Sequence, residues 1–262
     1  MKHLSLLLSS LLLVACGGGG GGGAPAGPVA STSAFALKQA LANDFLDTSS
    51  YPFTPGGSLT ITTASPHSST TGTVSGSGTV AQSAITNTTF EGVPAQTKTR
   101  TITGTLTVTV GAASASQPFP PSLSNIFASQ TFDLLGSFTP ATVVSGVAIP
   151  ASYLAAAAPV TLPAAANVGD AGLIGTFNTY GSAAKGAILS TTNLTYSLEA
   201  DTATTAILKL TAVNTASGVG SSTTVDTYRV TPAGAVTRLK RETPFSVSSG
   251  GTTISGALTI TY

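Results

Sequence analysis

The sequence predicts an all-β protein, mainly an antiparallel meander, with one short amphipathic helix near its N-terminus. From Ser58 onward, Thr, Val and Ile alternate with small polar residues, and β-branched residues at a period of two are typical of strands. The 29 glycines of the 262-residue chain supply many turns between such strands. A meander of this kind can close into a small barrel or fold into a sandwich, and the pattern does not choose between them.

The first residues predict a signal peptide. A short polar start with Lys2 and His3 precedes an apolar run from Leu4 to Val14. This run of about eleven residues is too short to span a hydrocarbon core, which needs roughly 20 helical residues. We therefore expect residues 1–15 to be a signal peptide that is removed.

The segment Leu13-Val14-Ala15-Cys16 resembles the bacterial lipobox, in which a small residue precedes a cysteine that receives a diacylglyceryl group. The resemblance implies cleavage between Ala15 and Cys16, lipidation of Cys16, and the membrane as a partner through that lipid. By similarity to enterobacterial lipoproteins, Gly17 stands where an aspartate would signal inner-membrane retention. This implies an outer-membrane lipoprotein whose body faces the periplasm or the cell surface.

Residues 16–32 are predicted to be a tether that begins at the lipidated cysteine. Seven glycines, Gly17 to Gly23, lead into an Ala/Pro/Gly segment, and random-coil scaling gives residues 17–28 a reach of roughly 20 Å. Cys16 is the only cysteine, so the mature chain has no disulfide to stabilise it.

A single helix is expected directly after the tether. Ser33 is a candidate N-cap for a helix from Ala34 to Leu46, because Leu37, Leu41 and Phe45 recur every four residues. The polar face lacks the Lys and Arg of membrane-surface helices, so we expect the helix to pack on the protein body.

The remaining chain divides into three expected segments. Residues 33–111 contain the helix and a β-rich half, and residues 112–166 form an ordered connector with too many prolines for regular central strands. Residues 167–262 form a C-terminal antiparallel half. Its six expected strands lie near 173–180, 187–198, 205–213, 223–231, 235–242 and 252–262.

Two decapeptides, 101–110 and 253–262, align without gaps, which indicates either an internal duplication or strands of one shared sheet. The second ends on Tyr262 and resembles the last strand of outer-membrane β-barrels, so a membrane-embedded barrel is an alternative. The absence of Trp and an aromatic content of 6% count against it. Residues 162–163, 168–172 and 228–238 are similar to segments of uncharacterised β-rich proteobacterial lipoproteins, a resemblance that carries no known activity.

Catalytic chemistry is not expected. His3 leaves with the signal peptide, His67 is the only other histidine, and no nucleophile-elbow, zinc-protease or phosphate-loop motif occurs. An enzymatic alternative would require Asp133, Asp170 and Asp226 to converge. We therefore predict that the protein is not an enzyme and has no catalytic residues and no cofactor.

Metal, nucleic-acid and head-group sites are weakly supported. Only the pairs Asp44/Asp47 and Glu199/Asp201 could supply carboxylates to calcium, and no EF-hand-like loop accompanies them, so no metal is predicted. With 7% charged residues and a net charge of +1, nucleic acid is excluded as a partner. Residues 238–241 form the densest basic cluster, with Arg238 and Lys240 expected on one exposed strand face and Leu239 on the other.

These features indicate a membrane-anchored envelope lipoprotein with a non-catalytic structural or interaction domain. The alternative is a carrier of an apolar ligand in the cavity of a curved β-sheet, near which alanines 155–158 and 164–166 would leave space. The expected partner, beyond the membrane, is accordingly another envelope protein or an apolar ligand.

Overall fold

The structure is a computed structural model that describes residues 30–64, 67–118, 122–144, 147–216, 220–249 and 251–262. The expected signal peptide, the lipobox with Ala15 and Cys16, and nearly all of the tether lie outside the described residues.

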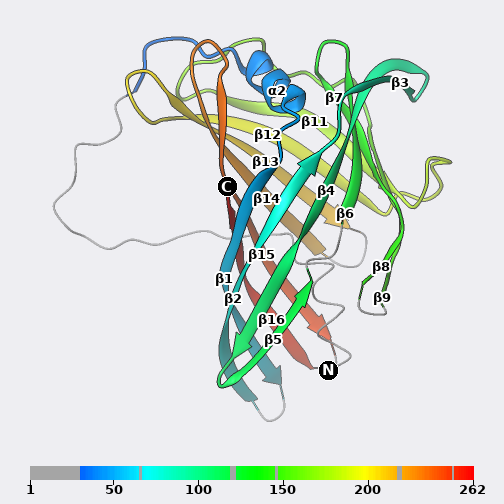
Figure 1. Cartoon of the computed structure of the whole chain (residues 1–262), viewed down its shortest axis with the longest axis vertical. Helices are drawn as coiled ribbons and strands as arrows, with labels where there is room; N and C mark the ends of the chain where they lie inside the picture. Colours follow the sequence, from blue (N-terminus) through cyan, green and yellow to red (C-terminus); the bar gives the residue numbers. More distant parts are fainter. Residues whose placement is uncertain (1–29, 65–66, 119–121, 145–146, 217–219, 250) are drawn as a thin grey trace.

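Twelve antiparallel strands form a closed barrel, so the prediction of an all-β fold is confirmed and the barrel, rather than the sandwich, is the form it takes (Figure 1). The ring runs β2-β1-β16-β15-β14-β13-β12-β11-β10-β7-β6-β4, and pairing between β2 and β4 closes it. The strands of the ring are β1 (Tyr51–Ala64), β2 (His67–Gln82), β4 (Val93–Val110), β6 (Ser122–Ser129), β7 (Leu134–Thr139), β10 (Ser152–Ala156), β11 (Ala171–Tyr180), β12 (Ser190–Ala200), β13 (Ala206–Ala216), β14 (Gly220–Val230), β15 (Val236–Ser249) and β16 (Thr252–Thr261).

All six strands expected in the C-terminal half are present, as β11 to β16. The expected connector differs from the prediction, because it supplies β6, β7 and β10 to the barrel wall. Pro140, Pro150, Pro159 and Pro163 lie between strands, so they do not interrupt the hydrogen-bonded ladder. Four short strands accompany the ring: β3 (Thr86–Phe90) and β5 (Ala113–Pro118) pair with β4, and β8 (Thr142–Val144) pairs with β9 (Val147–Ile149).

The alternation of each long strand places apolar residues inside the barrel and Thr or Ser outside. In β1, Phe53 and Leu59 are buried in an interior core, whereas Thr54 and Ser58 are exposed. The two aligned decapeptides lie on β4 and β16, which flank the β1–β2 hairpin and fill the same core. The two segments are therefore strands of one shared sheet with a common inner face.

The last strand illustrates the same orientation. Leu258 and Ile260 point into the interior core, so this strand carries its apolar residues inward, the reverse of the outward apolar band of transmembrane barrels. Gly256 faces the same interior, and a Cβ there would lie 2.8 Å from the Phe245 ring. Glycine at this position therefore makes room for a large core side chain.

A twelve-stranded barrel has a lumen too wide for wall side chains to fill, because barrel diameter grows with strand number. Helix α2 (Leu37–Leu46) lies across one end of the lumen (Figure 1). Its buried face, which includes Phe35 just before the helix and Leu37 and Ala40 within it, packs against β11 to β14 and against residues 160–168. The described residues include no helix long and apolar enough to cross a membrane.

The helix is shorter than predicted at its start. It begins at Leu37 rather than Ala34, and its N-cap is Ala36, which makes no side-chain cap. Ser33 is therefore not the cap, because the chain before the helix is instead extended: Phe35 exchanges backbone hydrogen bonds with Ala166.

Candidate binding site in the barrel interior

A cavity of about 230 Å³ lies in the lumen beneath helix α2. Its lining combines apolar side chains with charged groups from the barrel wall, the helix and the β6–β7 turn. Its apolar lining consists of Leu41, Phe45, Ile126, Ala128, Phe132, Leu134, Val160, Leu162, Ile174, Leu194 and Leu210. Its polar lining consists of Asp44, Lys98, Arg100, Asp133, Asp226, Tyr228 and Arg241.

The β6–β7 turn forms the part of the cavity wall that contacts the helix. Phe132 has a φ of +63°, which is unusual for a bulky side chain, and its ring lies 6.3 Å from the ring of Phe45. Asp133 receives a hydrogen bond of 2.9 Å from Lys38 of the helix. These two contacts hold the turn against the helix and support the strained conformation.

A β-bulge in β15 determines which basic residues face the cavity. The register shifts between Thr227 and Tyr228, so that Lys240 pairs with Thr227 and Arg238 pairs with Tyr228, leaving Leu239 as the extra residue. The expectation that Arg238 and Lys240 share one exposed face is therefore wrong. The bulge turns both Arg238 and Arg241 inward, whereas Lys240 pairs with Glu242 on the strand surface.

Arg241 and Asp226 form a bidentate ion pair at the cavity, with both N–O distances at 2.7 Å. Such parallel hydrogen bonds fix both groups in position. The Asp226 carboxylate raises the pKa of Arg241, so this guanidinium stays charged despite its burial. Burial likewise raises the pKa of the neighbouring Tyr228, whose phenol stays neutral.

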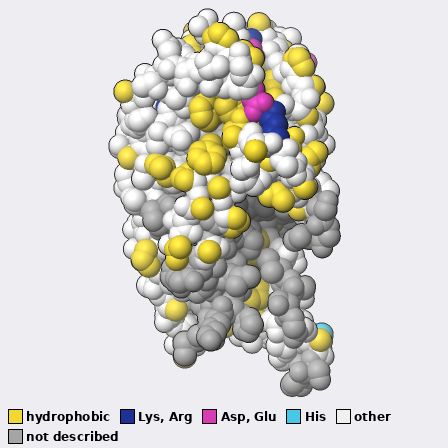
Figure 2. Space-filling model, turned by 90° about the vertical axis from the view of Figure 1, so that its right-hand side faces the viewer, with side chains coloured by type: hydrophobic (Ala, Val, Ile, Leu, Met, Phe, Trp, Pro, Cys, Tyr) yellow, Lys and Arg dark blue, Asp and Glu magenta, His cyan; other side chains and the backbone are white. Residues whose placement is uncertain are grey.

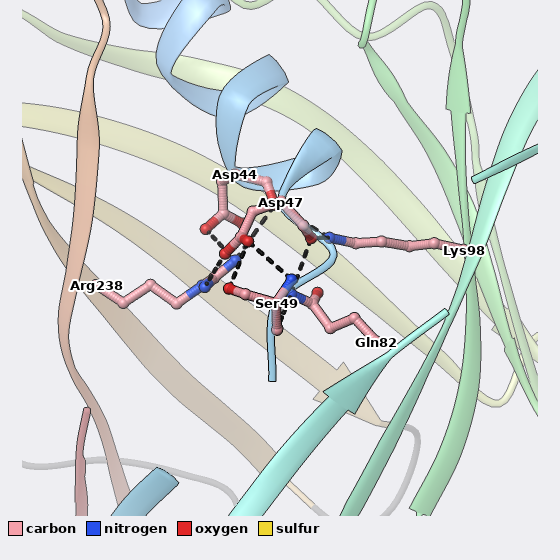
Figure 3. Close-up of polar contacts among 6 residues, drawn as sticks. All are labelled: Asp44, Asp47, Ser49, Gln82, Lys98 and Arg238. Carbon is pink, nitrogen blue, oxygen red and sulfur yellow. Dashed lines mark hydrogen bonds and ion pairs between the residues drawn. The ribbon is translucent and has the colours of Figure 1, made fainter. Parts of the chain in front are cut away.

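The C-terminal end of the helix is held by what we call the helix anchor: Asp44, Asp47, Ser49, Gln82, Lys98 and Arg238 (Figure 3). Lys98 donates to the backbone carbonyls of Asp44 and Asp47, each at 3.0 Å, and Gln82 donates to the carbonyl of Asp47 at 2.9 Å. Arg238 pairs with the carboxylates of Asp44 at 2.7 Å and Asp47 at 3.0 Å.

The helix anchor neutralises the negative end of the helix from outside the helix. No basic residue occupies the last turn of α2, so the cations that the helix dipole favours come from β4 and β15 of the wall. Burial would raise the pKa of Asp47, but hydrogen bonds from Ser49 and Arg238 outweigh it and lower the pKa to about 2. Asp47 therefore remains ionised and holds the helix over the cavity.

Lys98 is 1% exposed, and burial together with repulsion from Arg100 lowers its pKa to about 8. Its value in the unfolded chain is 10.5, so between pH 8 and 10.5 the unfolded state binds more protons. The free energy of unfolding should therefore rise with pH across this window, by about 2 kcal/mol between pH 7 and 10.

Urea unfolding of the wild type and of Lys98→Met at both pH values measures this effect. The stability difference between the two proteins should shift by about 2 kcal/mol in favour of the wild type at pH 10. The other titratable groups are present in both proteins, so their contributions cancel in the comparison. If the free energies of unfolding of the two proteins change with pH in parallel, the pKa of Lys98 is not lowered in the folded protein.

Arg100 differs from the other charged groups of the cavity. Its Nε is buried and has no hydrogen-bond partner, and the described residues offer its guanidinium no ion pair.

Lys98 and Arg100 were not predicted as site residues from the sequence. The sequence did contain a pattern that could have identified them. Lys98 and Arg100 occupy the same inward-facing positions of β4 as Ile102 and Leu106, so two charged residues interrupt an otherwise apolar face.

The carboxylates considered for catalysis or calcium binding do not converge on one site, and each makes a hydrogen bond or an ion pair with another residue. Asp133 and Asp226 line the cavity, but Asp170 does not and instead accepts a hydrogen bond from the backbone of Asn167. Glu199 pairs with Lys209, and Asp201 pairs with Arg229. No group of three or more metal-binding side chains occurs within the described ranges, and His67 is exposed at the start of β2.

The alanines expected beside a cavity do not line it. Ala155 packs in an aromatic cluster on the outer side of the barrel, and Ala166 pairs with Phe35 before the helix. The space in the lumen is instead bounded by larger aliphatic and aromatic side chains.

The aromatic cluster centres on Phe90 of β3, which stacks on Phe127 at 4.5 Å and on Tyr153 at 5.5 Å between ring centroids. Gly136 leaves room for the Phe90 ring, since a Cβ there would lie 2.6 Å from it. Figure 2 shows hydrophobic side chains gathered on this side of the molecule. The cluster fastens the β3–β4 hairpin to the wall and is separate from the cavity.

No protein family, curated protein or solved structure matches this chain, in sequence or in fold. The fold and the site therefore define a twelve-stranded β-barrel with a helix-covered interior cavity, and any function has to be argued from that geometry.

Proposed function

We propose that the protein is a non-catalytic, lipid-anchored envelope protein whose barrel binds a small molecule in the cavity beneath helix α2. The cavity carries this proposal: helix α2 covers the wide lumen of the barrel, yet the apolar and charged side chains beneath it leave a lined space open instead of filling it. Of the two functions considered from the sequence, binding in a curved sheet is therefore favoured over a purely structural role.

The size and lining of the cavity define the ligand class. At about 230 Å³ it is smaller than the 300–1,000 Å³ typical of drug-sized ligand pockets, so a compact molecule fits best. A predominantly apolar wall with a few fixed polar groups is the usual composition of a small-molecule site. The sequence analysis considered an apolar ligand, and the lining of the cavity favours a ligand that has both an apolar and a polar part.

The anchor to the membrane enters the proposal through Cys16. The lipobox resemblance supports lipidation of this residue followed by cleavage between Ala15 and Cys16, and the glycine tether supports a barrel that stands off the membrane. We place the protein at the outer membrane on the same resemblance. The inward direction of the apolar residues in β16 supports a barrel held by its lipid rather than by its wall.

The test is binding of 1-hexanol, a probe small enough for the cavity, followed by isothermal titration calorimetry and ligand-observed NMR. Burial of a six-carbon chain at about 0.8 kcal/mol per methylene predicts one site with a dissociation constant of about 0.1–1 mM. Ala128→Phe, which fills the cavity from β6, should abolish binding.

Ala115→Phe, on the exposed β5 strand, is the matched control and should bind as the wild type does. Thermal unfolding of both variants checks that the barrel is intact. Absence of saturable binding to the wild type, or equal binding to folded Ala128→Phe, would leave the structural role as the better account.

A further inference from the structure

The charged groups around the cavity do not balance. Lys38, Lys98, Arg100, Arg238 and Arg241 supply five cations, whereas Asp44, Asp47, Asp133 and Asp226 supply four carboxylates. Each carboxylate already has a cationic partner: Arg238 serves two, and Lys38 and Arg241 serve one each.

The excess charge falls on Lys98 and Arg100, but only Arg100 is free to bind a ligand. The Lys98 ammonium is occupied by two carbonyl groups of the helix anchor. The Arg100 guanidinium lines the cavity, has a buried Nε without a partner, and has no carboxylate partner among the described residues. Arg100 as a whole is half-buried, but its buried Nε–H is costly unless an acceptor such as an anion takes its hydrogen bond.

The surroundings of Arg100 favour a singly charged anion. Arg241 and the phenol of Tyr228 also line the cavity, and the Asp226 carboxylate already neutralises Arg241. Lys98 is held by helix carbonyls, so Arg100 is the cation left to pair with a ligand, and most of the remaining lining is aliphatic and aromatic.

We propose that the cavity binds a small monoanionic amphiphile, of the short-chain carboxylate class, whose head group pairs with Arg100. Its apolar tail lies against the helix and the β6–β7 turn, along Leu41, Phe45 and Phe132. This inference rests on the proposed function, because it names the ligand class of the same cavity. Planar bidentate pairing is the geometry that guanidinium and carboxylate groups share.

The test compares three probes of equal chain length, hexanoate, 1-hexanol and hexylamine, with the full-length protein at pH 7. A charge-assisted hydrogen bond in a buried site predicts that hexanoate binds at least about tenfold more tightly than 1-hexanol. Hexylamine should bind more weakly than 1-hexanol, because its charge repels Arg100.

Arg100→Gln should remove the preference for hexanoate and leave 1-hexanol binding unchanged, whereas Arg100→Lys should retain part of the preference. Arg229→Gln, on the outer face of the barrel, is the matched control and should keep the full preference. If Arg100→Gln does not fold, the three probes measured with the wild type and with Arg100→Lys still show whether hexanoate is preferred and whether that preference depends on Arg100.

The outcomes separate this inference from the proposed function. If 1-hexanol binds and hexanoate binds no more tightly, the anionic ligand class is wrong while the binding cavity stands. If none of the probes binds in the cavity, the proposed function fails as well, and water is its only occupant.

Discussion

We expect Arg238→Met to lower the free energy of unfolding by about 3 kcal/mol, because it leaves two carboxylates of the helix anchor without their cation. The Arg238 side chain is only 13% exposed and pairs with both Asp44 and Asp47. The Arg238 guanidinium also lies over the Tyr51 ring, with its Cζ 4.3 Å from the ring centroid. Met retains the aliphatic stem but not the guanidinium, so the loss reports the ion pairs together with this cation–π contact. For a domain of this size, the melting temperature should fall by roughly 6–12 °C.

The matched control is Arg229→Met, which breaks a geometrically similar pair with Asp201 on the outer surface. Solvent screens this exposed pair, so we expect little change in stability. Adding Asp44→Asn and Asp47→Asn to Arg238→Met should recover part of the loss, because the unpaired carboxylates are its source. Equal losses from the two arginine substitutions would mean that the helix anchor does not hold the helix in the barrel.

We expect Cys16→Ser, expressed with residues 1–15 replaced by a secretory signal peptide that is cleaved without lipidation, to move the protein completely from the membrane fraction to the soluble fraction of the envelope. The hydroxyl cannot accept the diacylglyceryl group as a thioether, and the removed acyl chains would contribute about 0.8 kcal/mol per buried methylene to membrane binding. Fractionation with immunoblotting measures the distribution, and mass spectrometry of the wild-type N-terminal peptide measures the lipid on Cys16.

The barrel itself should be unaffected by this substitution, because its strands begin at Tyr51. Equal thermal unfolding of detergent-extracted wild type and soluble Cys16→Ser is therefore the control. Retention of folded Cys16→Ser in the membrane fraction would contradict the proposed anchor.

The strand alternation made the wall of the barrel predictable. β-branched residues at a period of two located all six C-terminal strands, and the shared pattern of 101–110 and 253–262 reflects two strands with one inner core. The connector differs from the prediction because prolines were counted over the whole segment, whereas Pro140, Pro150, Pro159 and Pro163 lie between its strands. Barrel closure could not be foreseen, since it depends on pairing between β2 and β4 rather than on any local pattern.

The site was less predictable because its residues meet through the closure of the barrel. Arg238 and Arg241 face inward only because Leu239 forms a bulge, and a single extra residue inverts the face of its neighbours. Asp44 and Asp47 were noted as a pair, but their partners lie on β4 and β15, far away in sequence. Lys98 and Arg100 could have been found as charges within an otherwise apolar inward alternation.

Native mass spectrometry of the protein extracted from its own membrane in mild detergent tests the central claim, an interior cavity that binds a small molecule, most directly. We predict a reproducible, stoichiometric mass beyond the lipid on Cys16, present in the wild type and absent from folded Ala128→Phe. A bare lipoprotein in both samples, or a bound mass that survives filling of the cavity, would contradict it.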